Sequence, residues 1–352
     1  SCVLASSTRS TCVCRAIRSD AQMILAERRH FRARCRQQPF GENPVEGRIG
    51  GVDVWNDHSR PVAQAAVGDP SFGDRGMSAK TAALLGLLTA LDAAGYDFIT
   101  PTPSVSRRGL ERRLSQHSRL RAIFGWSQPF APCDLDPALL ALAEEAQVLV
   151  QEGDLYRCQV RVSRLAGLLF LHSAFPANAS DAVFLGPDSY RFARLIAQAT
   201  SDQAVAAIAE IGCGAGVGGL VASRLHPTAR LELGDVNLAA LELAHVNATH
   251  ADVAAQIRKS DGMTALNGPY DLIVANRPYV AGVSGRPYKD GGDMHGARLA
   301  LDWTQQAMER LSPGGRFVLY TGSAILDGGV DALRQALEDR VSAASLRMRY
   351  EE

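Results

Sequence analysis

A glycine-rich run flanked by two acids is the first stretch of the chain whose residue types and spacing suit ligand chemistry. It reads Glu210-x-Gly212-x-Gly214-x-Gly216, and Asp235 follows at the end of the next apolar segment. Glycines between a strand and a helix let a ligand approach the backbone, and the helix that follows presents free amides and a positive dipole end. The sequence therefore predicts a cofactor site at this turn.

Two cofactor patterns overlap in the turn. Gly214-x-Gly216-x-x-Gly219 satisfies the dinucleotide fingerprint, with Asp235 at the distance that pattern requires. Read from Glu210 instead, the same turn resembles motif I of the class I S-adenosylmethionine-dependent methyltransferases. In that family the acid and first glycines surround the methionine end of the cofactor. The later acid, here Asp235, holds the ribose hydroxyls.

Residues downstream separate the two patterns. Asp261-Gly262 follows a short strand expected around Ile257, where this family uses a carboxylate to accept from the adenine amino group. The apolar run Tyr270–Ala275 then ends in Asn276-Arg277-Pro278-Tyr279, which closely resembles the Asn-Pro-Pro-Tyr motif of methyltransferases that act on planar nitrogen. The resemblance implies S-adenosylmethionine as the cofactor. It assigns cofactor binding to Glu210, Gly212, Cys213, Gly214, Gly216, Asp235, Val236, Asp261, Gly262 and Asn276.

The chemistry of a planar nitrogen explains the residue types that the motif uses as catalytic residues. An amide or exocyclic amine has a delocalised lone pair, so hydrogen bonds from its two protons to the Asn276 side-chain oxygen and the Arg277 carbonyl would orient it toward the methyl group. Tyr279 would stack on the planar group, and Pro278 would stiffen the turn. Arg277 stands where the family has proline, which loosens the loop and adds a charge at the substrate mouth. The resemblance assigns substrate binding to Pro187, Asp188 and Tyr190.

Regular alternation of strands and helices from Ala204 onward must position these motifs. This alternation predicts a parallel sheet with helices on both faces, which is the Rossmann-like α/β sheet of class I methyltransferases. A sixth strand is expected over Ala344–Tyr350. The family closes its sheet with an antiparallel seventh strand, and the chain ends at Glu352 before one, so we expect an open sheet edge or a truncated C-terminus.

The N-terminal half reads differently. Ser78 can cap a helix that carries the apolar positions from Ala82 to Leu91, which begins a small, mostly helical domain, and alternation over Tyr156–Phe175 predicts a β-hairpin linker. The first 76 residues show no sustained apolar period, so we expect the folded protein to begin at Met77. The expected division is residues 1–76, 77–178 and 179–352.

Composition excludes several classes of protein. The 37 basic residues equal the 37 acidic ones, so a generally basic surface that coats nucleic acid is excluded. The seven cysteines show no C-x-x-C spacing, which predicts neither a metal site nor a disulfide framework and indicates a reducing compartment. With no long apolar run, the chain is expected to be cytoplasmic and not to span a membrane.

The substrate is less constrained than the cofactor. A helical domain, a hairpin and an Asn-Pro-Pro-Tyr-type motif most resemble the methyltransferases that modify glutamine side chains, so the expected partner is a release factor or a ribosomal protein. The same motif serves methyltransferases of adenine or guanine exocyclic amines in RNA or DNA, and arginines between Arg107 and Arg121, followed by Phe124 and Trp126, favour that alternative. A dehydrogenase would need a further catalytic domain, and a non-catalytic module is supported only by Arg277. The oligomeric state is left open.

Overall fold

The computed structural model describes residues 12–16, 46–56, 77–102, 119–175, 179–277, 297–344 and 346–351. The chain forms two compact units, and each combines segments that lie far apart in the sequence. The first unit contains residues 1–67, 195–211 and 267–352, and the second contains residues 68–194 and 212–266. The linear division expected from the sequence stays a prediction.

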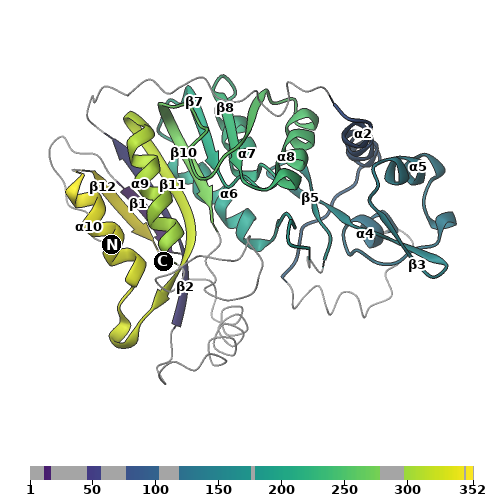
Figure 1. Ribbon diagram of the computed structural model, residues 1–352, viewed down its shortest axis with the longest axis horizontal. Helices are drawn as coiled ribbons and strands as arrows, with labels where there is room; N and C mark the ends of the chain where they lie inside the picture. Colours follow the sequence, from purple (N-terminus) through teal and green to yellow (C-terminus); the bar gives the residue numbers. More distant parts are fainter. Residues whose placement is uncertain are drawn as a thin grey trace. The chain divides into compact units, whose positions relative to one another are not determined.

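A mostly parallel sheet forms the centre of the first unit (Figure 1). Its strand β10 (Tyr270–Asn276) pairs in parallel with β7 (Ala207–Ile211) on one side and with β11 (Leu311–Ile325) on the other. Every residue of β7 is buried, as expected for a parallel strand that helices cover on both faces. Helices α9 (Arg298–Arg310) and α10 (Ala332–Ala343) pack against β11.

The N-terminal region supplies an antiparallel strand to this sheet. Strand β2 (Glu46–Asn56) pairs antiparallel with β11 and with β12 (Arg347–Glu351), and β1 (Cys12–Ala16) pairs with β2. The expectation of an open sheet edge is therefore wrong, and so is the expectation that the folded protein begins at Met77. Strands pair through backbone groups, so a segment distant in sequence can complete an edge although its apolar alternation is short.

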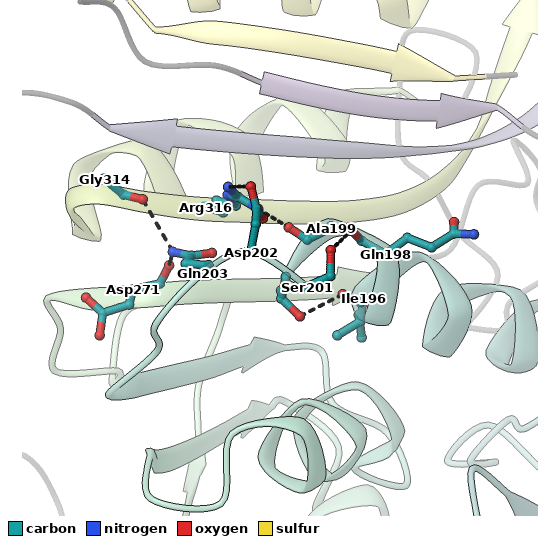
Figure 2. A network of polar contacts seen from close by, with 10 residues as sticks. Ile196, Gln198, Ala199, Ser201, Asp202, Gln203, Asp271, Gly314 and Arg316 are labelled. Carbon is teal, nitrogen blue, oxygen red and sulfur yellow. Dashed lines mark hydrogen bonds and ion pairs between the residues drawn. The ribbon is translucent and has the colours of Figure 1, made fainter.

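A polar network fixes the start of β7 against β10 and β11 (Figure 2). Gln203 Nε2 donates to the Asp271 carbonyl at 2.9 Å, and the Asp271 carboxylate accepts from the Ala206 amide at 2.8 Å. Arg316 in β11 pairs with Asp202 at 2.7 Å, and this ion pair lowers the pKa of the Asp202 carboxyl. Side chains from the loop before β7 thus hold the parallel register of the three strands.

Helices α2 (Ala79–Ala93), α4 (Arg119–Phe124) and α5 (Pro137–Glu145) begin the second unit. Ser78 caps α2 as expected, because its side-chain oxygen accepts from the Thr81 amide at 3.1 Å. Helix α2 packs against α5 and also against α8 (Leu238–His250).

Two hairpins follow these helices. The expected hairpin is confirmed as β5 (Val160–Leu165) paired antiparallel with β6 (Leu168–Ser173). Its two-residue turn has φ values of 49° at Ala166 and 82° at Gly167, which suit the right-handed twist of the flanking strands. The sequence reading missed the shorter hairpin of β3 (Leu149–Glu152) and β4 (Leu155–Cys158).

The rest of the second unit continues the strand and helix alternation predicted from the sequence. Strand β8 (Arg230–Asp235) pairs in parallel with β9 (Ala255–Lys259), and both α8 and α7 (Val217–Leu225) pack on β8. Helix α6 (Pro187–Ala199) begins in the second unit and ends in the first. Within the described ranges, no helix has the length and apolar character needed to cross a membrane.

Candidate functional site

The glycine turn follows β7 and has the backbone conformation that its sequence requires. Gly212, Gly214 and Gly216 have φ values of 61°, 52° and 79°, a left-handed region that residues with a side chain rarely adopt. The amide of Cys213, between the first two glycines, donates to the Gly234 carbonyl at 3.0 Å. Since α7 begins directly after the turn, the positive end of its dipole adds to a surface that can receive a polar ligand.

Asp235 ends β8 and holds the turn through its carboxylate. One oxygen accepts from the Gly214 amide at 2.8 Å, and the other accepts from the Asn237 amide at 2.9 Å. Burial raises the pKa of this carboxyl, while the backbone amides act in the opposite direction. Each carboxylate oxygen has a second lone pair, so the group can accept two ligand hydroxyls while keeping both backbone bonds.

Three further predicted cofactor residues lie in the same unit as Asp235. The Val236 side chain is 54% exposed, which offers an apolar surface next to an oriented acid. Asp261 is exposed at the start of the turn after β9, and Gly262 has a φ of 56°. A flat ligand with neighbouring hydroxyls and a polar edge suits these three features.

Ser260 is a residue of this region that the sequence reading missed. Its amide donates to the Asp235 carbonyl at 3.0 Å, and its hydroxyl donates to the Gly262 carbonyl at 2.9 Å. It therefore joins the end of β8 to the turn that carries Asp261. Its position directly before the predicted Asp261-Gly262 pair was the only available signal in the sequence.

In the first unit, Glu210 and Asn276 lie toward the carboxyl ends of two neighbouring parallel strands. Glu210, which is 2% exposed in β7, lies in register with Val274 of β10. Asn276 is the last residue of β10 and lies in register with Tyr320 of β11. Both residues are thus near the carboxyl ends of parallel strands, where open α/β sheets bind their ligands.

Arg277 differs from its expected environment. Its amide donates to the Tyr320 carbonyl at 3.2 Å, so the strand pairing continues one residue past Asn276. Successive side chains in extended backbone point to opposite faces, and the Arg277 side chain is only 1% exposed. Burial lowers the pKa of its guanidinium to about 9. The side chain is therefore buried and not exposed, and a role for its charge at the substrate mouth stays a prediction. Pro278 and Tyr279 lie outside the described residues.

The three expected substrate residues lie in the first turn of α6. Pro187 begins the helix, and Asp188 pairs with Arg191 at 3.4 Å. The Tyr190 hydroxyl accepts from the Thr100 amide at 3.0 Å, and burial raises its pKa. Tyr190 therefore joins α6 to the segment after α2, and the binding role of all three residues stays a prediction.

Known proteins match part of the chain. A family model described as methyltransferase small domain matches residues 188–326. Ribosomal RNA small subunit methyltransferase C of Serratia proteamaculans is 35% identical over 69 residues, which are 20% of this chain and 20% of that protein. The protein of the same name from Haemophilus influenzae is 32% identical over 69 residues, 20% of this chain and 21% of its own length. The chain thus spans about a fifth of the curated relatives it matches.

A solved structure shows a further similarity. The 16S rRNA N2 G1207 methyltransferase of T. thermophilus, in complex with AdoMet and guanosine, has a TM-score of 0.35 and 21% identity, with 51% of this chain and 52% of that chain covered. The family match encloses Glu210, Asp235 and Asn276, and the observed alternation of strands and helices agrees with it. Residues 188–326 therefore match the methyltransferase small domain, and their strands and helices alternate as in a Rossmann-like α/β fold.

Proposed function

We propose that the protein transfers a methyl group from S-adenosylmethionine to the exocyclic amine of a purine in small-subunit ribosomal RNA. The observation that carries this proposal is the Asp235 carboxylate, which is bonded to the Gly214 amide at 2.8 Å within a domain of methyltransferase type. The names of the two curated relatives favour RNA over the glutamine side chain that the sequence reading put first.

The residues of the second unit fit the proposed cofactor. Asp235 can accept from both ribose hydroxyls, since the Gly214 and Asn237 amides orient its two oxygens. Gly214 has a φ of 52°, which a residue with a side chain rarely adopts, so a glycine at this position lets the turn present its backbone to a ligand. Exposed Val236 can cover the adenine face. When bound, S-adenosylmethionine supplies an electrophilic methyl group on a sulfonium sulfur.

Asn276 and Arg277 would orient the acceptor nitrogen. The Asn276 side-chain oxygen and the Arg277 carbonyl would accept the two amine protons, which would leave the nitrogen lone pair available for the methyl group. The bond from the Arg277 amide to the Tyr320 carbonyl, 3.2 Å long, ties this segment to β11 and limits its movement. After transfer the nitrogen carries a positive charge and loses one proton to water, so this mechanism needs no dedicated side-chain base.

Pro278 and Tyr279 are assigned to the proposed acceptor site from the sequence motif alone. Tyr279 would stack on the purine ring, which is a larger flat surface than a glutamine amide. Arg119 in α4 is one of the arginines between Arg107 and Arg121, and its side chain is 54% exposed. Its 3.6 Å ion pair with Asp134 is a weak surface pair, so the guanidinium can contact phosphate. These features favour an RNA acceptor.

A transfer assay with tritiated S-adenosylmethionine tests the proposal. The purified chain is incubated with unmethylated small-subunit ribosomal RNA, with assembled small subunits and with a recombinant release factor. We expect label that nuclease releases and protease does not, and nucleoside mass spectrometry should identify a methylated purine amine. Protease-sensitive label in the release factor would replace this proposal with glutamine methylation. If the chain binds S-adenosylhomocysteine but labels none of these acceptors, both RNA methylation and glutamine methylation are refuted.

A further inference from the structure

A buried amide outside the predicted motifs contacts the glycine turn. Asn247 in α8 is 0% exposed, and its side chain makes three hydrogen bonds. Its Nδ2 donates to the Ala215 carbonyl at 3.0 Å and to the Leu171 carbonyl at 3.0 Å, and its Oδ1 accepts from the Leu171 amide at 2.8 Å. One side chain thus joins the turn, β6 and α8.

The contact with β6 resembles strand pairing. Among the described residues, strand β6 forms a two-stranded sheet with β5, and Leu171 lies in register with Val162. On the other edge of β6, the Asn247 amide bonds both backbone groups of Leu171, as a neighbouring strand would. A buried amide that satisfies two backbone groups has one orientation, because rotation by a half-turn would set donor against donor and acceptor against acceptor. The remaining Nδ2 proton is therefore aimed at Ala215.

The contact with Ala215 completes a series of anchors along the turn. Cys213 is held by the Gly234 carbonyl, Gly214 by the Asp235 carboxylate and Ala215 by Asn247. The flanking glycines have positive φ and gain the most freedom when a restraint is lost. The Asn247 contact reaches the turn from α8, which also bonds β6 of the hairpin. The other two contacts come from Gly234 and Asp235 of β8.

We propose that Asn247 is a positioning residue for the cofactor, which holds the Gly212–Gly216 turn in its binding conformation and links that turn to β6. The inference rests on the proposed cofactor role of the turn. It predicts that loss of the amide weakens cofactor binding through turn conformation, with no contact between Asn247 and the cofactor.

Asn247→Leu removes all three bonds and keeps the branched heavy-atom skeleton of the side chain. S-adenosylhomocysteine serves as the probe, and its Kd is measured by calorimetry well below the unfolding temperature of each variant. We expect binding about tenfold weaker than wild type, since one ordering hydrogen bond of the turn is lost. Val246→Ala is the matched control, because Val246 is also 0% exposed in α8. Its loss of packing should lower stability and leave the Kd within about twofold of wild type.

The outcomes separate this inference from the proposed function. If the wild-type chain does not bind S-adenosylhomocysteine, the proposed cofactor role itself fails. If the wild type binds and folded Asn247→Leu binds equally well, the positioning role is wrong. Should Asn247→Leu fail to fold, Asn247→Ser replaces it in the same comparison, since its shorter side chain cannot keep all three bonds.

Discussion

Asp235→Asn is expected to weaken cofactor binding strongly while it changes stability little. The substitution keeps the shape of the side chain but removes the charge and turns one of the two acceptors into a donor. That donor then faces the amide of Gly214 or Asn237, which now approach the carboxylate at 2.8 and 2.9 Å. Charge-assisted bonds to the ribose hydroxyls contribute about 1.5–3 kcal/mol. Their loss corresponds to a Kd roughly ten- to one hundredfold higher, whereas the donor set against a backbone donor is present with and without the ligand and lowers stability instead.

The direction of the pKa shift explains why stability should change less than affinity. Burial raises the pKa of Asp235 above its ordinary value of 3.8, so the folded chain binds this proton more tightly than the unfolded chain does. The ionised carboxylate therefore costs stability above its folded pKa, and this cost is relieved as the pH falls through that value. Loss of the charge in Asp235→Asn removes the same cost and offsets part of the lost hydrogen bonding.

Calorimetry with S-adenosylhomocysteine over a pH series, together with thermal unfolding, checks both parts. Wild-type affinity should fall on acidification at a pH above that of an ordinary aspartate, because the ribose hydroxyls need the ionised acid, and Asp235→Asn should lack this dependence. Asp252→Asn is the matched control, since it removes the same charge at an exposed position with a φ of 54° that asparagine tolerates. Affinity of Asp235→Asn within threefold of wild type would refute the reasoning, as would an equal loss in Asp252→Asn.

Three further substitutions test separate parts of the structure. Asn276→Ala should abolish methyl transfer and leave the Kd for S-adenosylhomocysteine nearly unchanged; loss of binding in calorimetry would contradict its role at the acceptor nitrogen. Arg277→Pro restores the family residue but removes the amide bonded to the Tyr320 carbonyl at 3.2 Å, so urea unfolding should show a loss of about 1–3 kcal/mol, and unchanged stability would refute that contact. Asn237→Ala removes the N-cap of α8, whose oxygen accepts from the Ala239 amide at 3.0 Å, and should cost about 1 kcal/mol in the same measurement. A variant as stable as wild type would show that the cap is dispensable.

Local features of the fold could be predicted from the sequence because they depend on neighbours along the chain. The helix cap at Ser78, the hairpin turn at Ala166 and the glycines with positive φ follow from short-range hydrogen bonds and steric limits. The spacing between the glycine turn and Asp235 also predicted that both serve one ligand site, and the structure adds the direct bond from the Gly214 amide to the Asp235 carboxylate.

Other features were decided only by the tertiary structure. The apolar pattern of residues 46–56 is too short to mark a strand, and backbone pairing with β11 and β12 is what places it in the sheet. The sequence suggests an exposed charge at Arg277. In the structure the bond from its amide to the Tyr320 carbonyl continues the strand, and its side chain is buried. Asn247 is an ordinary helix residue in sequence, and its three partners meet only where α8, β6 and the turn pack together. Sequence spacing thus determined the chemistry of this domain, whereas long-range backbone pairing and burial determined which side chains hold it in place.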